Sequence, residues 1–257
     1  MTACTKPIGL QLYPFRDALA ADFRGSLARI AHIGYVAVEF LGLHGHTPAE
    51  AAAITSQLGL RTCASHRPLP TGDALCDALD EAEVLQYAFP VANSSREDCA
   101  SEETVQALSA RLERAAAFFE QHGLCFALHN HWWEFASSNA GRFAWETIMD
   151  QAPDLSAELD TYWCAHGGRT DPAGVIASYR SRIPLLHIKD GTLGETPGHT
   201  PVGGGDLDIP AIMRAADPTV VKWVIVDLLE DSHADMFESA RESYRYLTIE
   251  SLAAGRR

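Results

Sequence analysis

Residues 126–135 read Phe-Ala-Leu-His-Asn-His-Trp-Trp-Glu-Phe, and this stretch decides the fold of the chain. Its first half belongs to an apolar run that has the length of a buried strand, expected at 125–129. His129 and His131 lie two positions apart, so both side chains point to the same side of an extended chain. A buried strand with polar side chains at its carboxyl end is typical of a (β/α)8 barrel, in which functional groups project from the C-terminal ends of the strands.

Seven further short apolar runs have this length, and Ala-rich segments with helical spacing separate them. The eight expected strands are residues 9–13, 36–40, 61–65, 84–88, 125–129, 156–160, 185–188 and 223–227. Helices are expected at 23–33, 48–57, 103–121, 142–151, 172–180 and 234–247. Gly34, Gly59 and Gly123 supply end signals, since glycine readily adopts the left-handed conformation at a helix C-terminus. Alternating units of this kind predict a parallel sheet with helices outside it.

The chain is expected to form one TIM-barrel domain over residues 1–257. Its 257 residues match the length of one such barrel, about 250 residues. No Pro/Ser-rich linker divides it. The Gly-rich stretch 191–208 follows the seventh expected strand, so we interpret it as a long loop on the active face rather than as a domain boundary.

An open doubly wound sheet could also be built from eight alternating units. A dinucleotide-binding fold of that class needs G-x-G-x-x-G after its first strand, and residues 8–15, Ile-Gly-Leu-Gln-Leu-Tyr-Pro-Phe, contain nothing similar. Six of the eight expected strands instead end in or beside a titratable residue. These residues are Glu39, His66, His129, Asp160, His187 and Asp227. Their positions favour the closed barrel with one polar site at its mouth.

Imidazole and carboxylate groups that converge at a barrel mouth are suitable ligands for a divalent metal ion. The predicted ligands are His129, Asp160, His187 and Asp227. Two nitrogen ligands favour Mn, Zn, Co or Fe, although Mg remains allowed. A single His at a strand end is more often a hydrogen-bonded structural residue than a ligand. The metal interpretation therefore depends on four such groups lying on consecutive strands.

Several other polar and aromatic residues have plainer interpretations. We interpret Asp171 and Asp190 as turn or cap residues, Asp206 as a loop anchor and Asp208 as the N-cap of a helix that begins at Ile209. Tryptophans beside polar strand ends are either core residues or an apolar wall for a sugar ring, and the sequence leaves both roles open. These tryptophans are Trp132, Trp133 and Trp163.

Composition limits the partners. A formal net charge of -14 argues against nucleic acid and anionic membranes, which require clustered Lys and Arg. No apolar window approaches about 20 residues and the first residues lack a leader-like apolar run, so we expect a cytoplasmic protein. The six cysteines contain no C-x-x-C pair and are expected to be reduced thiols. The sequence leaves the formation of a homo-oligomer open.

Several sequence motifs, in their order along the chain, resemble those of the xylose isomerase-like TIM-barrel family of sugar phosphate isomerases and epimerases. They are residues 65–66, 126–135, 158–163 with Gly167, Gly168, Asp171 and Pro172, 183–191, 202–208 and 243–247. The resemblance covers essentially the whole chain and is specific for the superfamily, not for one reaction. It implies a metal ion held by the ends of strands five to eight, which correspond here to His129, Asp160, His187 and Asp227.

This chain departs from the family pattern at informative positions. Many epimerases of the family carry Glu on strands five and eight, where this sequence has His129 and Asp227. That difference argues against a mechanism with two carboxylate bases. Trp163 stands where many relatives have His. Glu134 could replace His129 as the strand-five ligand if the backbone turns sharply after Asn130.

We therefore expect a metal-dependent isomerase, epimerase or dehydratase-type lyase of carbohydrate metabolism, acting on a keto sugar or polyol derivative through an enediolate. Glu134, His131 or Asp227 would be the base, and Lys189 would place a positive charge near the developing oxyanion. Glu39 and His66 would bind hydroxyl groups, with Trp133 and Trp163 as apolar walls. The acidic charge balance and the lack of an Arg cluster favour an unphosphorylated sugar.

Two alternatives stay open. The first is a non-catalytic sugar-binding barrel whose metal site has been lost. The second is a nuclease resembling endonuclease IV, which the net charge of -14 opposes, because a domain this acidic would retain DNA weakly at physiological salt.

Overall fold

Eight parallel strands close into a barrel in the computed structural model, which describes residues 6–136, 138–139, 141–168, 170–228 and 235–256. The barrel strands are β1 (Lys6–Gln11), β2 (Ala37–Leu41), β3 (Arg61–Arg67), β4 (Pro90–Asn93), β5 (Ala127–His129), β8 (Ser156–Asp160), β9 (Leu185–Ile188) and β12 (Trp223–Val226). Each strand pairs with the next in this order, and β12 pairs with β1 to close the ring, with Ile8 opposite Val224. The predicted (β/α)8 barrel is confirmed.

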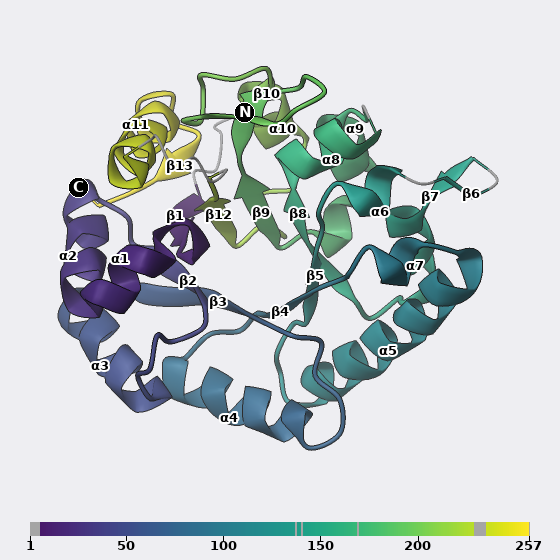
Figure 1. Ribbon diagram of the computed structural model, residues 1–257, viewed down its shortest axis with the longest axis horizontal. Coiled ribbons are helices and arrows are strands. Elements are labelled where there is room, and N and C mark those ends of the chain that lie inside the picture. Colours follow the sequence, from purple (N-terminus) through teal and green to yellow (C-terminus); the bar gives the residue numbers. More distant parts are fainter. Residues whose placement is uncertain (1–5, 137, 140, 169, 229–234, 257) are drawn as a thin grey trace.

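Helices surround the barrel on its outside (Figure 1). They are α1 (Arg16–Ala21), α2 (Phe23–Ile33), α3 (Pro48–Gln57), α4 (Ala74–Leu85), α5 (Glu102–Gln121), α6 (Trp133–Ala136), α7 (Ala144–Gln151), α8 (Thr161–Gly168), α9 (Pro172–Tyr179), α10 (Ile209–Ala215) and α11 (Met236–Ile249). Short elements connect them: η1 (Tyr13–Phe15), η2 (Glu97–Cys99), η3 (Arg180–Arg182), β6 (Ser138–Asn139), β7 (Arg142–Phe143), β10 (Asp190–Thr192), β11 (Gly198–Thr200) and β13 (Ala253–Ala254). The helix predicted at 234–247 is α11, and residue 234 lies outside the described residues.

Local signals explain where several helices begin and end. Thr47 caps α3 by accepting a hydrogen bond from the backbone N–H of Glu50, whose carboxylate accepts one from Thr47 N–H in return. Gly34 has a φ of 125° at the end of α2, and Gly123 has a φ of 75° just beyond α5. Both glycines therefore end their helices as the sequence predicts.

The expected strand at 84–88 is wrong, because Val84 and Leu85 form the last turn of α4. Ala78, Ala82 and Leu85 are buried and share one face of this helix, which ends at Gln86 in the left-handed conformation with a φ of 58°. The fourth barrel strand is β4, which begins at a proline, a position where a missing N–H is tolerated. The apolar run of residues 84–89 thus contains a helix end and a connection, and the strand follows it.

The barrel has a second apolar core in its lumen, separate from the larger core between strands and helices. It consists of Ala37, Cys63, Ala64, Phe89, Val91, Ala127, Leu185, Trp223 and Ile225. Successive lumen positions lie two residues apart on a strand, so Ala127 precedes His129, and Leu185 precedes His187. The lumen is therefore apolar toward the N-terminal ends of the strands and polar toward their C-terminal ends.

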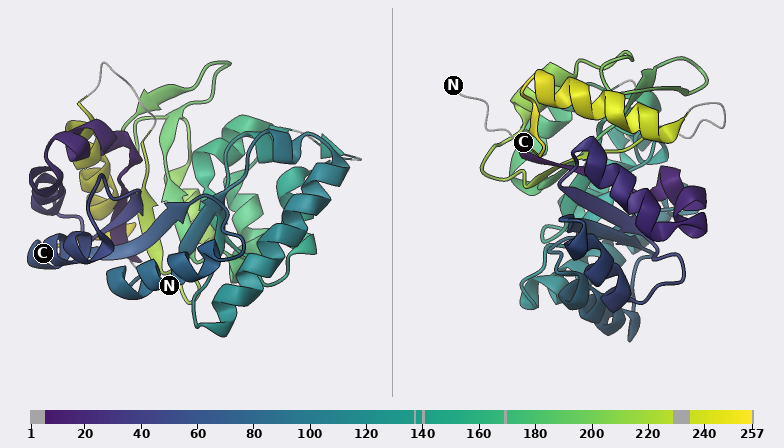
Figure 2. Two further views of the ribbon diagram at one scale, coloured as in Figure 1. Left: turned by 60° about the horizontal axis from the view of Figure 1, so that its bottom comes forward. Right: turned by 90° about the vertical axis from the view of Figure 1, so that its left-hand side faces the viewer.

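The antiparallel pair β10 and β11, which begins at Asp190 and continues into the Gly-rich stretch 191–208, projects from the barrel (Figure 2). Asp190 fixes it by accepting hydrogen bonds from the backbone N–H groups of Gly203 and Gly205, at 3.0 Å each. A Cβ on Gly205 would overlap the Asp190 carboxylate, so only glycine fits there. Asp190 is thus the predicted turn residue, and Asp206 anchors the loop by accepting from Leu193 N–H.

The other plain interpretations of acidic residues are also confirmed. Asp171 caps α9 through Ala173 N–H, and Asp208 caps α10 through Ala211 N–H. The five described cysteines are free thiols, and Cys4 lies outside the described residues. Within the described part of the chain, every helix is too short or too polar to cross a membrane.

Candidate active site

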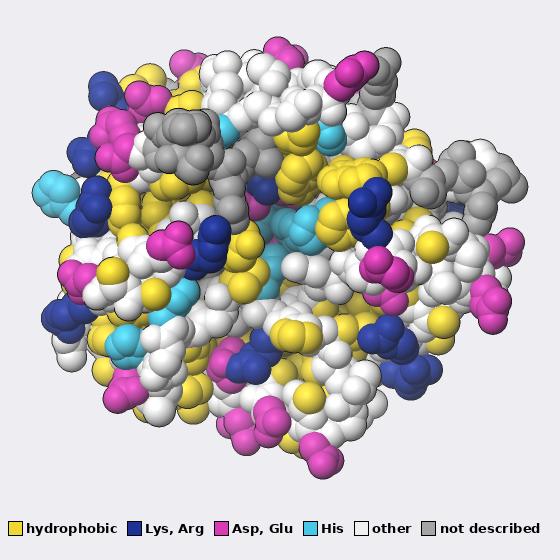
Figure 3. All heavy atoms as spheres, viewed as in Figure 1, with side chains coloured by type: hydrophobic (Ala, Val, Ile, Leu, Met, Phe, Trp, Pro, Cys, Tyr) yellow, Lys and Arg dark blue, Asp and Glu magenta, His cyan; other side chains and the backbone are white. Residues whose placement is uncertain are grey.

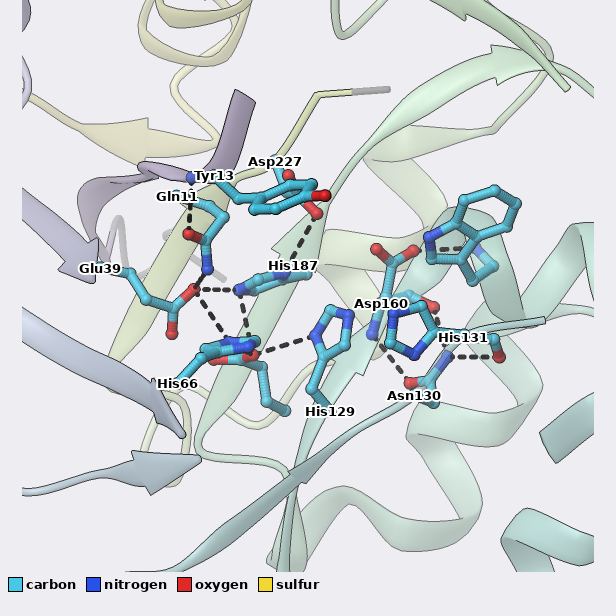
Figure 4. A network of polar contacts seen from close by, with 12 residues as sticks. Gln11, Tyr13, Glu39, His66, His129, Asn130, His131, Asp160, His187 and Asp227 are labelled. Atoms are coloured by element: carbon cyan, nitrogen blue, oxygen red, sulfur yellow. Dashed lines mark hydrogen bonds and ion pairs between the residues drawn. The ribbon is translucent and has the colours of Figure 1, made fainter. Parts of the chain in front are cut away.

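Polar side chains from several barrel strands converge in the lumen (Figure 4), and their order along the strands divides them into two layers. The lower layer contains Glu39, His66, His129 and Glu158. The upper layer, nearer the C-terminal ends of the strands, contains His131, Asp160, Lys189 and Asp227. Glu158 and Asp160 illustrate how one strand serves both layers, because they lie two residues apart on β8 and face the same side. His187 lies between the layers and contacts both.

In the lower layer, imidazole rings from three strands converge on one carboxylate. Glu158 Oε2 lies 2.7 Å from His66 Nε2, 3.0 Å from His129 Nδ1 and 3.1 Å from His187 Nε2. Glu39 Oε2 lies 2.6 Å from the same His187 nitrogen and accepts a hydrogen bond of 2.6 Å from the Gln11 amide. Both carboxylates are fully buried, so their charges lie where screening by water is weak.

The pKa values of the lower layer move in opposite directions. Burial would raise the pKa of Glu39, but the charges of His66 and His187 lower it well below its usual value. Burial would lower the pKa of His66, yet Glu39 and Glu158 raise it to about 10. His129 has a pKa well below its usual range, because it is buried beside the cationic His187. Protonated His66 and neutral His129 therefore share one carboxylate at neutral pH.

In the upper layer, one ammonium group pairs with two carboxylates. Lys189 Nζ lies 2.6 Å from Asp227 Oδ2 and 3.1 Å from Asp160 Oδ2. Burial would lower the pKa of Lys189, but the charges of Asp160 and Asp227 raise it, so the lysine is protonated at neutral pH. Burial would raise the pKa of Asp227, which the Lys189 charge instead lowers below its usual value.

Backbone contacts fix Asp160 in place. Its Oδ1 accepts a 2.8 Å hydrogen bond from the backbone N–H of Trp163, because α8 begins directly after β8 and offers free N–H groups there. The Asn130 amide hydrogen-bonds to both the backbone N–H and the carbonyl of Asp160, at 2.9 and 3.2 Å. The carboxylate thus has a defined position at the mouth.

A cavity of about 510 Å³ opens above these layers, within the size range of small-molecule sites. It is lined by Gln11, Tyr13, Leu41, His66, Asn93, His129, His131, Trp163, His187, Lys189, Asp227 and Leu228. Figure 3 shows histidine side chains in this hollow near the centre of the face. Burial and the nearby Lys189 charge lower the pKa of His131 to about 4, so its imidazole is neutral at neutral pH.

The side chains of Glu134 and Trp133 do not line the cavity, and both contact Ser94 instead. The Glu134 carboxylate accepts hydrogen bonds from Ser94 Oγ at 2.5 Å and from the backbone N–H of His131 at 2.9 Å. Trp133 Nε1 donates to the same Ser94 hydroxyl, and its ring stacks on His131 at 4.2 Å. Burial raises the pKa of Glu134 to about 7. Both residues therefore support the position of His131 from behind.

The structure divides the four predicted metal ligands into two groups. Ligand atoms of Asp160, His187 and Asp227 lie within 4.8 Å of one another, and His129 belongs with His66, Glu158 and His187 in a second group of the same compactness. Among the other predicted site residues, His66, His131, Lys189 and Trp163 line the cavity. The Glu39 carboxylate lies within the lower layer, where it contacts His66, His187 and Gln11.

Several residues of the site were not predicted as such, among them Gln11, Asn130 and Glu158. The alternation of Glu158 and Asp160 on one strand was a visible signal that both carboxylates enter the lumen. Gln11 and Asn130 carry no comparable signal, because amides at strand ends have many structural roles.

Comparisons with known proteins agree with this architecture. The family model of the xylose isomerase-like TIM barrel matches residues 27–248. A sugar phosphate isomerase/epimerase from Parabacteroides distasonis ATCC 8503 has 23% identity and a TM-score of 0.80, with 97% of this chain and 98% of that chain covered. A D-allulose 3-epimerase from Methylomonas sp. in complex with D-allulose has 16% identity and a TM-score of 0.70, with 95% and 97% covered.

A xylose isomerase-like TIM barrel protein from Mycobacterium smegmatis in complex with magnesium has 12% identity and a TM-score of 0.72, with 98% of each chain covered. These structures are similar in fold at low identity. A comparison with curated proteins gave no match. The family model covers most of the chain, and the resemblance inferred from the sequence motifs is confirmed. The chain belongs to the xylose isomerase-like TIM-barrel family.

Proposed function

We propose that this protein is a metal-dependent isomerase, epimerase or dehydratase-type lyase that acts on an unphosphorylated keto sugar or related polyol derivative through an enediolate. One observation carries the proposal. Asp160, His187 and Asp227 bring their ligand atoms within 4.8 Å of one another at the polar mouth of the barrel, where His187 and Asp227 line a cavity of about 510 Å³.

The upper layer suits a divalent metal ion. Asp160 Oδ2 and His187 Nδ1 are buried and have no well-directed hydrogen-bond partner among the described residues, although Lys189 Nζ lies 3.1 Å from the former. Asp160, His187 and Asp227 would hold the ion, which supplies Lewis-acid polarisation of a carbonyl when bound. Each carboxylate oxygen has a second lone-pair direction, so ion and ammonium can share these two groups.

Other residues of the upper layer suit proton transfer next to a carbonyl. His131 lines the cavity, is neutral at neutral pH, and has a buried Nδ1 without a partner among the described residues, so it is the base we favour. Lys189 holds a fixed positive charge at the same wall and would stabilise an oxyanion. Trp163 places its ring beneath that ammonium, 5.1 Å away, and would form the apolar wall against a sugar ring.

The charges of the cavity support an unphosphorylated substrate. Among the described lining residues, Lys189 is the only Lys or Arg, and its charge is already paired with two carboxylates. Phosphate groups are frequently bound by a bidentate Arg, and the described lining residues include none. A similar fold with bound D-allulose makes free ketohexoses the first substrates to try.

The test is exchange of the proton next to the carbonyl with solvent. The metal-loaded protein would be incubated in D2O with D-allulose, D-fructose and a phosphorylated ketose, and exchange followed by proton NMR. We expect exchange of a free ketose that needs the metal and falls roughly 10²- to 10⁴-fold in His131→Gln. His32→Gln, the same change at an exposed position on α2, is the matched control.

Two outcomes would contradict the proposal. Faster exchange of the phosphorylated ketose would exclude the unphosphorylated substrate. Binding of a free sugar without any exchange would instead support the non-catalytic sugar-binding barrel, an alternative favoured by the Lys189 ammonium that already neutralises both carboxylates.

A further inference from the structure

The imidazole rings of His66 and His129 in the lower layer, together with that of His187 between the layers, surround the fully buried carboxylate of Glu158. The ring centroids of His66 and His129 are 5.0 Å apart, and those of His129 and His187 are 4.7 Å apart. Ligand atoms of these three residues and of Glu158 all lie within 4.8 Å of one another. We infer that the lower layer binds a second divalent cation, zinc by preference, with His66, His129 and Glu158 as its protein ligands. This site is independent of the reaction proposed above.

Protons alone leave the lower layer incompletely paired. Three imidazole nitrogens converge on Glu158 Oε2, while its Oε1 has no hydrogen-bond partner among the described residues. Glu39 Oε1 and His66 Nδ1 are buried and also unpartnered within the described part of the chain. Unpaired buried polar atoms are rare in native proteins and cost stability. A cation bound by Glu158 would give this carboxylate, whose Oε1 is unpartnered, a charge partner that the described protein atoms do not supply.

The charge of the layer fits a divalent ion. Glu39 and Glu158 place two carboxylates at positions with no solvent exposure. The apolar lumen core, which includes Ala127 and Leu185, closes the layer from below. An ion of charge +2 balances the two carboxylates when the imidazoles of this layer are neutral, which is the state that metal binding requires.

The spacing of the ligand atoms fits the same ion. Zinc binds His nitrogen and Glu oxygen at about 2.0 to 2.2 Å, so the ligands of a tetrahedral ion lie roughly 3.3 Å from one another. His66 Nε2 and His129 Nδ1 lie 2.7 and 3.0 Å from Glu158 Oε2, so they need to move only a few tenths of an ångström outward. Two imidazoles and one carboxylate form a ligand set typical of zinc sites that keep an open fourth position.

His187 contacts both layers, but it is not needed as a ligand of the lower ion. Its Nε2 lies 2.6 Å from Glu39 Oε2, and its Nδ1 faces Asp227 Oδ2 at 3.6 Å. A neutral imidazole binds a metal through one nitrogen and donates the other N–H to a carboxylate. We therefore assign Nδ1 to the upper layer and the Nε2–H donor to Glu39, which leaves His66 and His129 for the lower ion.

The experiment counts and locates zinc. The protein would be stripped with a chelator, reloaded with Zn²⁺, and analysed by inductively coupled plasma mass spectrometry together with anomalous X-ray diffraction at the zinc edge. We expect two zinc ions per wild-type chain, the loss of one in His66→Gln, the loss of the other in Asp160→Asn, and no loss in the exposed control His32→Gln. In wild-type crystals one anomalous peak should lie within bonding distance of His66, His129 and Glu158.

The two variants separate this inference from the proposed function. Loss of one zinc in His66→Gln with no loss in Asp160→Asn would support the lower site and contradict the metal site at the mouth. Loss only in Asp160→Asn would overturn the lower site and leave the proposed function intact. If His66→Gln does not fold, the wild-type anomalous map decides, and the absence of a peak beside Glu158 overturns the inference.

Discussion

The two polar layers of the lumen lie one strand alternation apart but differ in what their charged groups face. In the lower layer, Glu158 is surrounded by imidazoles, above the apolar core of the lumen. In the upper layer, Lys189 and Asp227 form an ion pair, and both side chains line the cavity. The lower layer occupies positions that branched apolar residues normally fill in a TIM barrel. The difference teaches that depth in the barrel decides how a carboxylate is placed. Glu158 is enclosed by imidazoles and does not line the cavity, whereas Asp227 lines it.

The largest effect should come from breaking the lower layer. Glu158→Gln removes the charge shared by three imidazoles, and we expect it to lower the free energy of unfolding by about 3 to 5 kcal/mol. The reason is that it breaks buried ion pairs and leaves Glu39 as the one carboxylate among the described residues that contacts both His66 and His187. Chemical denaturation in the presence of a chelator would measure the decrease. Glu103→Gln, the same change on the exposed face of α5, should stay within about 0.5 kcal/mol of wild type. A similar small effect for Glu158→Gln would mean that the lower layer is not paired by charge.

The upper layer should affect activity more than stability. Asp160→Asn keeps an oxygen that accepts the Trp163 N–H but removes the negative charge beside Lys189. We expect kcat/KM to fall at least roughly 10²- to 10³-fold, because the variant loses a charge that would hold the metal ion needed for the reaction. Steady-state kinetics on the substrate found by proton exchange would measure this, with the exposed Asp80→Asn as control. Unchanged kinetics would place the chemistry elsewhere in the barrel.

The sequence predicted which polar side chains face the lumen, but not how deep in the barrel each of them lies. Alternation along each strand placed His129, Asp160, His187 and Asp227 in the lumen, and the structure agrees. Height in the barrel depends on how neighbouring strands are staggered, and that register is set by tertiary pairing. For this reason His129, paired opposite Glu158, lies with the lower layer, whereas Asp160 pairs opposite His187.

Two other differences have local causes. Residues 84–88 have the apolar content of a strand, but the helical spacing that begins at Ala74 extends to Leu85 and takes precedence. Glu134 is on α6, after a turn that no sequence signal specifies, and its carboxylate faces Ser94. Apolar periodicity is a local property, and neither the end of a competing helix nor the direction of a turn can be read from it.

Glu134 can be compared with Glu39. Both side chains are fully buried, but the hydrogen-bond donors to Glu134 are neutral groups. Its pKa is raised to about 7, whereas the pKa of Glu39 is lowered by His66 and His187. Below pH 4.5, Glu134 is protonated in both folded and unfolded chains, and above pH 7 it must ionise inside the protein. The contribution of Glu134 to stability should therefore fall as the pH rises from 4.5 to 7, by on the order of 1 to 3 kcal/mol.

Glu134→Gln should remove this fall. Unfolding free energies of wild type and variant would be measured across this pH interval with a chelator present, and their difference isolates the carboxyl group. Because the folded state holds the proton more tightly than the unfolded state, the wild type should lose stability relative to the variant as the pH rises. A difference that grows in the opposite direction would mean that the carboxylate has a positive partner, as Glu39 does.

The smallest effect should come from the wall of the upper layer. Trp163 lines the cavity and carries the Lys189 ammonium 5.1 Å from its ring. Trp163→Ala should raise KM roughly 5- to 30-fold, corresponding to about 1 to 2 kcal/mol of lost contact, and leave kcat nearly unchanged, because a flat wall binds substrate and transition state alike. Trp163→Phe, which keeps an aromatic face, should recover most of the affinity.

Trp132→Ala is the matched control, since this tryptophan packs on Arg96 and does not line the cavity. A fall in kcat at constant KM in Trp163→Ala would contradict the role of a binding wall. It would mean that the ring acts through Lys189, by holding the ammonium where negative charge develops. An effect on KM would therefore show that the Trp163 ring only binds substrate. An effect on kcat would show that it belongs, with the charged residues of the upper layer, to the groups that stabilise the transition state.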